Sequence, residues 1–338
     1  VPNLAPGNYY IKATNYSGAG NYTISTTFTA SPYPSDIEPN NYMNQAVQVQ
    51  PTDTAIGILG YIGQSYQDDN DWYKITLVED GSLTLRVLTN QTLTVNTLYL
   101  FDSDTNTIIA SGNWGTDATV NHPNLSPGSY YINLSHYTGY GGYQFISTFV
   151  PAYYPNDNLT NDQIENAQVI GINDSLTGRL GYYNNGYTDI SDYYKFTIQE
   201  DGKIRFHVVT TQSLYTDDLL IFDTDTNTLI INGSWGQDAQ VVYNNISPGI
   251  YYLKVPRYTG YGSYYLTSTF TPATYPNDQE FNDIIQNSIP ILPNDSLTGR
   301  LGYYGSGHTD IADYYHFTTS VDGKIRFRVV TTDILQTN

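Results

Sequence analysis

Apolar and polar residues alternate along most of this chain with a period of two. In residues 194–198 (YKFTI), Tyr194, Phe196 and Ile198 fall on one side, and the lysine and threonine between them fall on the other. The same alternation recurs in residues 204–208 (IRFHV). Because successive side chains of a strand point to opposite faces, this pattern predicts strands with one buried and one solvated face.

Short runs of turn-forming residues separate these predicted strands. Residues 200–202 (EDG), 223–227 (DTDTN), 247–249 (SPG) and 260–262 (GYG) place Gly, Pro, Asn or Asp between alternating segments. The one helix-like stretch, residues 163–169, is short enough to be a single turn. We therefore predict an all-β chain built from antiparallel β-sandwiches of jelly-roll-like form.

The sequence repeats itself at a fixed interval of 121 residues. The motif S-P-G-x-Y-Y at 126–131 returns at 247–252, and the version A-P-G-N-Y-Y stands at 5–10. Residues 173–183 (NDSLTGRLGYY) recur letter for letter at 294–304. Loops normally tolerate insertions, so this constant interval indicates either recent duplication or a geometry that needs equal spacing.

A polar Tyr-Pro-x-Asp stretch in each copy is where we expect a linker between domains. It predicts two complete sandwiches, residues 34–154 and 155–275. Residues 1–33 would be the C-terminal part of a repeat, and residues 276–338 the N-terminal half of another. Half a sandwich leaves apolar rows and strand edges uncovered, so we expect other copies to complete it head to tail, as a longer array or as separate subunits.

Composition and charge exclude several function classes. The 338 residues carry 13 Lys and Arg against 32 Asp and Glu, a net charge of −19. This sign argues against nucleic acid and against an anionic membrane surface as partners. Cysteine is absent, which removes disulfides and thiolate metal sites. No apolar run approaches the roughly 18 residues of a membrane span.

The motifs of each copy stand in a fixed order. An E-x-N-D opening at 280–283 precedes D-x-x-D-Y-Y at 310–315, and a D-G turn at 201–202 precedes the S-P-G-x-Y-Y motif at 247–252. This order resembles the bacterial and archaeal pre-peptidase C-terminal (PPC) domain, which is related to the collagen-binding domains of clostridial collagenases. The resemblance covers essentially the whole chain as repeated copies. It implies a β-sandwich on an extracellular or cell-surface protein.

Carboxylate and amide side chains gather at the opening of each copy and again at its D-x-x-D motif. The resemblance to calcium-binding relatives and the preference of Ca²⁺ for six to eight oxygen ligands both predict a calcium site there. Its candidate ligands are Asp36, Glu38, Asn40, Asn41, Asp68 and Asp71 in the first copy, Asp157, Asn161, Asp162, Asp189 and Asp192 in the second, and Asp278, Glu280, Asn282, Asp283, Asp310 and Asp313 in the third. Leu159 replaces a glutamate in the second copy, and Asn41 replaces an aspartate in the first. The alternative is that these residues only form turns in solvated linkers.

Signals for catalysis are weak. Each of the five histidines occurs in one copy only: His122, His136, His207, His308 and His316. The chain contains no G-x-S-x-G elbow, no H-E-x-x-H motif and no phosphate-binding glycine loop. We therefore predict that this chain is not an enzyme.

Tyrosine and asparagine add two further features. Tyr10, Tyr131 and Tyr252 fall on the face opposite the core, where they could bind sugars, peptides or neighbouring chains; the alternative is that Tyr serves as an amphipathic strand former. Ten Asn-x-Ser/Thr sequons offer positions for N-glycans. They are Asn15, Asn21, Asn90, Asn124, Asn133, Asn158, Asn173, Asn232, Asn245 and Asn294.

Two functions follow from these observations. The first is a structural repeat protein of an extracellular filament, stalk or surface layer, assembled head to tail and stiffened by calcium at the domain junctions. The alternative is a non-catalytic array that anchors a secreted enzyme or adhesin to a polysaccharide or a collagen-like fibrous protein. Equal repeats, the absence of cysteine, the many sequons and the lack of a catalytic constellation favour the first function.

Overall fold

The computed structural model describes residues 1–31, 37–63, 67–90, 92–104, 106–153, 161–274, 282–331 and 335–337. They fall into two compact units, one of residues 1–155 with 182–188 and one of residues 156–181 with 189–338. Across the described ranges the only helices are 3₁₀ turns, η1 (Met43–Gln45), η2 (Ile164–Asn166) and η3 (Ile285–Asn287). The predicted all-β fold class is confirmed. No helix in this part of the chain is long and apolar enough to cross a membrane.

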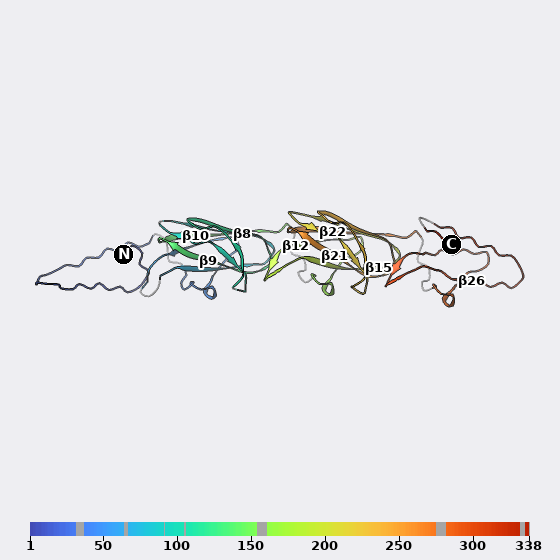
Figure 1. The fold of residues 1–338 in the computed structure, drawn as a ribbon, viewed down its shortest axis with the longest axis horizontal. Coiled ribbons are helices and arrows are strands. Elements are labelled where there is room, and N and C mark those ends of the chain that lie inside the picture. The colour runs from blue at the N-terminus through green and yellow to red at the C-terminus, as the bar shows by residue number, and fades with distance from the viewer. Residues whose placement is uncertain are drawn as a thin grey trace. The chain divides into compact units, whose positions relative to one another are not determined.

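The first unit is a sandwich of two sheets (Figure 1). One sheet has the order β1-β3-β9-β6-β7, with β5 also on β9, and the other has the order β14-β13-β8-β4-β10-β2. Its strands are β1 (Val47–Val49), β2 (Asp53–Leu59), β3 (Asn70–Leu77), β4 (Gly81–Thr89), β5 (Thr94–Val95), β6 (Tyr99–Phe101), β7 (Ile108–Ser111), β8 (Asp117–Leu125), β9 (Gly128–Thr138), β10 (Gly141–Pro151), β13 (Tyr183–Asn184) and β14 (Tyr187–Thr188).

The second unit repeats this architecture. Its sheets have the orders β11-β15-β21-β18-β19, with β17 on β21, and β12-β22-β16-β20-β24-β25, while β23 pairs with β26. Its strands are β11 (Gln168–Val169), β12 (Ser175–Leu180), β15 (Ser191–Ile198), β16 (Gly202–Thr210), β17 (Tyr215–Thr216), β18 (Leu220–Phe222), β19 (Leu229–Asn232), β20 (Asp238–Ile246), β21 (Gly249–Thr259), β22 (Gly262–Pro272), β23 (Ile289–Pro290), β24 (Tyr304–Gly305), β25 (His308–Thr309) and β26 (Tyr315–His316).

The alternating pattern decides which side chains enter each core. On β16 the side chains of Ile204, Phe206 and Val208 are fully buried between the sheets, while the residues between them face outward. Tyr194 and Phe196 of β15 join the same cluster from the opposite sheet. Burial of apolar surface contributes roughly 25 cal/mol per Å², so these rows are the main stabilising term of the sandwich.

Two segments with the same alternation do not form the strands that their pattern predicts. Residues 317–331 and 9–31 carry no strand, and Phe327 and Tyr10 are exposed. The physical reason is the absence of pairing partners. In the second unit β16 pairs with β20 and β22, and residues 323–331 have no equivalent strands beside them among the described residues.

A short hairpin adds a strand to one sheet of each unit. We call residues 182–188 and 303–309 the clasp hairpins. The backbone N–H of Ser126 donates to the carbonyl of Tyr183 (2.8 Å), and the Tyr183 hydroxyl donates to Asp102 Oδ2 (2.8 Å). Burial and the hydrogen bond to Asp102 raise the pKa of Tyr183 to about 12, so its phenol stays neutral and donating beyond the pH at which an ordinary tyrosine ionises.

The second unit repeats this clasp with equivalent residues. Ser247 N–H donates to the carbonyl of Tyr304 (2.9 Å), and the Tyr304 hydroxyl donates to Asp223 Oδ2 (2.7 Å). Each clasp hairpin stands, by its place in the 121-residue repeat, in the copy that follows the sheet it joins. The sheet of one copy is therefore extended by residues of the next.

A buried ion pair lies in the second unit. The guanidinium of Arg300, 5% exposed, contacts the carboxylate of Asp201, 1% exposed, in the D-G turn before β16. The Arg300 guanidinium also lies over the Tyr303 ring, 5.7 Å from its centroid. Arg300 precedes the second clasp hairpin in sequence, so the ion pair ties that segment to the core of the preceding copy.

Candidate metal centre

The opening of each copy is held against the strand that carries the D-x-x-D motif. The backbone N–H of Trp72 on β3 donates to the carbonyl of Asn40 (2.9 Å). The equivalent bonds run from Tyr193 to Asn161 (2.8 Å) and from Tyr314 to Asn282 (3.0 Å). The same hydrogen bond in three copies places each opening segment beside the D-x-x-D aspartates.

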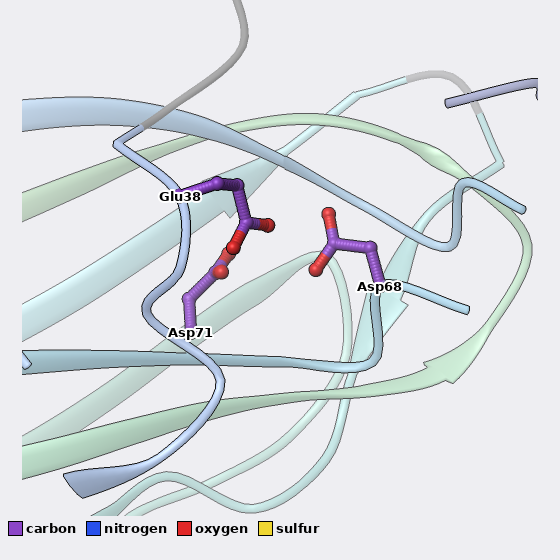
Figure 2. Close-up of side chains that lie close together, drawn as sticks. All are labelled: Glu38, Asp68 and Asp71. Carbon is purple, nitrogen blue, oxygen red and sulfur yellow. The ribbon is translucent and has the colours of Figure 1, made fainter. Parts of the chain in front are cut away.

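In the first copy this arrangement brings three carboxylates together. One carboxylate oxygen from each of Glu38, Asp68 and Asp71 lies within 4.8 Å of the others. Figure 2 shows the three carboxyl groups pointing toward one another, from the opening segment, the loop before β3 and β3 itself. Asp68 and Asp71 are buried, whereas Glu38 is exposed. Two like charges 4 Å apart near a protein surface repel by about 4 kcal/mol, so the cluster favours a counter-ion.

The second copy forms the same kind of cluster from Asp162, Asp189 and Asp192, again with oxygens within 4.8 Å. Asp162 is half-buried, and the other two are buried. Burial raises the pKa of Asp162, and a hydrogen bond with Asp189 opposes that rise. A cation bound here would favour the charged form of all three carboxylates.

A pair of buried tyrosines fixes one aspartate in each cluster. The Tyr143 hydroxyl donates to Asp71 Oδ2 (2.6 Å) and lies 2.6 Å from the Tyr73 hydroxyl. In the second copy the Tyr264 hydroxyl donates to Asp192 Oδ2 (2.5 Å) and lies 2.5 Å from that of Tyr194. We call each trio, Tyr73–Tyr143–Asp71 and Tyr194–Tyr264–Asp192, a tyrosine relay. A relay anchored in the core holds the carboxylate in one orientation.

Buried amide groups in the opening segments of the second and third copies test whether a metal ion fits. Asn161 is 1% exposed, and neither its Oδ1 nor its Nδ2 has a hydrogen-bond partner among the described residues. Asn282 shows the same arrangement in the third copy. A buried polar atom without a partner costs about 1–3 kcal/mol, and an oxygen-preferring cation would satisfy Oδ1. The donor set therefore suits a hard metal ion, and both clusters could hold one.

The candidate ligands named from the sequence differ in burial and in contacts. Asn40, Asn161, Asn282, Asp189 and Asp310 are buried, and the Asn41 side chain donates from Nδ2 to Glu38 Oε2 (3.1 Å). In the third copy, Asp283 has a buried Oδ1 without a hydrogen-bond partner in the described ranges, and Asp313 has its own buried Oδ1. Asp36, Asp157, Asp278 and Glu280 lie outside the described residues.

Sequence reasoning missed the tyrosine relays and the aspartates of the clasps. Tyr143 and Tyr264 recur at the interval of 121 residues within G-x-Y motifs, and that recurrence was the available signal. Asp102 and Asp223 are the first residues of the D-x-D-x-N loops. Their composition indicates only a turn, and it does not predict that each aspartate accepts a hydrogen bond from a tyrosine of the following copy.

Comparison with known proteins supports the PPC resemblance over part of the chain. No family model matches. A stretch of 105 residues, 31% of this chain, is 30% identical to Collagenase ColT from Clostridium tetani (strain Massachusetts / E88). The chain spans about a tenth of the length of that relative, since the match covers 10% of it.

Two solved structures are also similar. The pre-peptidase C-terminal domain of a collagenase from Bacillus anthracis is 27% identical, with 30% of this chain and 94% of that domain covered and a TM-score of 0.26. The secreted serine protease VesC from Vibrio cholerae is 11% identical, with 60% and 51% covered and a TM-score of 0.21. The sequence similarity to a collagenase thus covers about 30% of the chain.

Proposed function

We propose that this chain is an extracellular, non-catalytic array of PPC-like modules that attaches a secreted protein to a polysaccharide or a collagen-like protein. The similarity of 105 residues to a collagenase is the observation that carries this proposal. The 121-residue repeat multiplies that module along the chain, and repeated weak sites on one chain bind a polymer with increased avidity. The sequence contributes no catalytic motif of its own.

Co-sedimentation of the purified chain with insoluble polymers tests this function. The polymers are cellulose, chitin, an insoluble β-1,3-glucan and fibrillar collagen. We expect retention on a polysaccharide or on collagen, and no hydrolysis of any of them. Absence of retention on all four polymers contradicts the proposal, as does release of soluble fragments by the purified chain.

We further propose that Ca²⁺ is the ion of the acidic clusters. The support is the set of carboxylate oxygens from three residues within 4.8 Å of one another, and in the second copy the buried Oδ1 of Asn161, the residue before Asp162. Bound calcium would join the opening segment of each copy to its D-x-x-D strand. The chain's own residues then orient the ligands, Asp71 and Asp192 through their tyrosine relays.

Chelation is expected to lower the melting temperature. An ion at a hundred times its dissociation constant stabilises the native state by about 2.7 kcal/mol, and such modules bind at roughly 10⁻⁴–10⁻³ M. EDTA should therefore lower the melting temperature by several degrees, and Asp192→Asn should reduce the response of the second unit. Calorimetry with and without 10 mM calcium, about ten to a hundred times that dissociation constant, checks this. Glu200→Gln, which removes an exposed charge outside the cluster, is the control and should keep the full response. An EDTA-insensitive melt contradicts calcium binding.

A second candidate function is a structural filament or surface layer assembled from copies of this chain. The observation that favours it is the pair of uncovered segments, residues 9–31 and 317–331. The first contains most of the residues equivalent to β21–β22, and the second contains the end of the β15 equivalent and all of the β16 equivalent. In the second unit β15 pairs along its whole length with β21, and β16 along its whole length with β22. One copy could thus complete another head to tail, with N-glycans at exposed sequons such as Asn21.

Light scattering and electron microscopy test the filament. Linear oligomers that lengthen with concentration support it, and replacement of Phe327 with Asp should then shorten them, because a charge would enter the shared apolar row. A chain that stays monomeric at all concentrations and forms no fibres contradicts this second function, and leaves the binding array in place.

A further inference from the structure

An exposed pair of aromatic rings recurs in both units. In the first unit, Trp114 and Tyr137 are 62% and 60% exposed, with ring centroids 5.7 Å apart and ring planes at 60°. In the second unit, Trp235 and Tyr258 are 61% and 65% exposed, at 6.0 Å and 56°. Two units reproduce the same pair at the interval of 121 residues, with the same exposure and nearly the same angle. We call each pair an aromatic platform.

The backbone beneath each platform is tied into the sheet. Gly115, next to Trp114, exchanges backbone hydrogen bonds with Val95 in both directions (3.1 and 3.0 Å), and β5 pairs with β9 beside Tyr137. In the second unit, Gly236 and Thr216 exchange the same two bonds (3.1 and 3.0 Å). The rings are therefore held by strands instead of a free loop. Preorganisation of this kind lowers the entropy lost when a ligand binds.

The platforms do not contribute to the hydrophobic cores. Neither tryptophan nor its tyrosine belongs to the buried clusters of the two sandwiches. An aromatic ring buries about 150–250 Å² when it packs, and here most of that area faces water. The ring planes of each pair are inclined at 60° and 56°, so the rings do not stack face to face, and their high exposure leaves ring surface available to a ligand.

The chemistry around the platforms favours a neutral ligand with one apolar face. The chain carries a net charge of −19, which disfavours anionic polymers. In the second unit, Arg257 precedes Tyr258, and its Nε donates to the carbonyl of Gly260 (2.5 Å), so that donor is already used within the turn. A sugar ring offers C–H groups to the face of an indole, and hydroxyls on its rim can meet the Trp N–H and the Tyr hydroxyl.

We infer that the two aromatic platforms, Trp114 with Tyr137 and Trp235 with Tyr258, are stacking sites for a neutral polysaccharide. This inference rests on the proposed function as a binding array and names its ligand and its contact residues. One platform binds a sugar ring weakly. Two platforms on one chain bind a repeating polymer more tightly, because the second contact is intramolecular after the first has formed.

The test compares tryptophan variants on insoluble β-1,3-glucan, cellulose and chitin, with fibrillar collagen as the protein arm. We expect Trp114→Ala and Trp235→Ala each to weaken glycan binding about tenfold, since tryptophans of this kind dominate interface energetics. The double variant should fall to background. Tyr16→Ala, which removes another exposed aromatic ring, should bind like the unaltered chain. The Trp→Phe variants keep a ring at each site and should recover part of the affinity.

Each outcome separates this inference from the proposed function. Glycan binding that survives in the folded double variant, with an unchanged melting temperature, overturns the inference and leaves the binding array standing. Binding to collagen alone does the same. No binding to any polymer overturns both. If the Ala variants are destabilised, the Trp→Phe variants and the quenching of Trp fluorescence by soluble β-1,3-glucan oligosaccharides test the stacking sites instead. Absence of quenching in the unaltered chain contradicts them.

Discussion

Replacement of Arg300 with Met is expected to lower the free energy of unfolding of the second unit by about 3–5 kcal/mol. The carboxylate of Asp201 is 1% exposed and contacts the Arg300 guanidinium. Without that guanidinium the buried carboxylate loses an opposite charge that offsets its desolvation. Urea denaturation followed by circular dichroism measures the change as a lower midpoint with an unchanged slope.

Two further variants separate the loss of the ion pair from loss of packing. The double variant Arg300→Met with Asp201→Leu should recover much of the stability, because a buried pair replaced by apolar groups of similar volume is often neutral. Arg86→Met removes the exposed partner of Asp117 in the first unit and should leave stability almost unchanged. If Arg300→Met and Arg86→Met have equal effects, the buried pair does not stabilise the fold.

Replacement of Phe145 with Ala is expected to destabilise the first unit by about 3–5 kcal/mol and to weaken metal binding. Phe145 is buried on β10, and its ring stacks on Tyr73 with centroids 4.7 Å apart and planes at 12°. The cavity left by the ring removes this contact, and Tyr73 begins the tyrosine relay to Asp71. Thermal melts and calcium titration by calorimetry measure the two effects.

The matched control for this variant is Tyr143→Phe. It keeps the ring volume and removes the hydroxyl that donates to Asp71 Oδ2. We expect a loss of about 1–2 kcal/mol in stability and a clear loss of calcium affinity, since the ring is kept and the hydroxyl's hydrogen bonds with Asp71 and Tyr73 are lost. If Phe145→Ala lowers the free energy of unfolding no more than Tyr143→Phe does, the packing of Phe145 contributes little to the stability of the core. Should calcium affinity stay constant in both, the relays do not position the metal ligands.

Much of the fold was predictable because it depends on local pattern. Ile204, Phe206 and Val208 alternate with polar residues, as in a strand with one buried face, and their side chains are buried as expected. The repeat interval carries this information from one copy to the next, so one recognised strand identifies its equivalents. What alternation cannot supply is a pairing partner. Residues 323–331 have the same pattern as β16, yet no strand forms there, since a strand is defined by its neighbours.

The acidic residues of the site were visible in the sequence, and the contacts that orient them were not. Asp68 and Asp71 are close in the chain, so their proximity follows from spacing alone. Tyr143 stands far from Asp71 in sequence and reaches it through the packing of β10 against β3 across the core. Trp114 and Tyr137 likewise meet only because β5 places the loop before β8 beside the end of β9. Such contacts are properties of the tertiary fold.

Because each clasp hairpin extends the sheet of the preceding copy, we expect the stability of one copy to depend on the copy that follows it. The sheet of one copy includes a hairpin whose flanking residues, Gly181 and Asp189, belong to the next unit. When that next copy unfolds, its hairpin loses the scaffold that presents it, and the preceding sheet is exposed at β8. Stability then becomes a sum of terms for each copy and for each adjacent pair, as in a one-dimensional Ising chain. Under this scheme, longer arrays melt more sharply and at higher temperature than single copies, and a ligand bound to one copy raises the melting point of the copy before it.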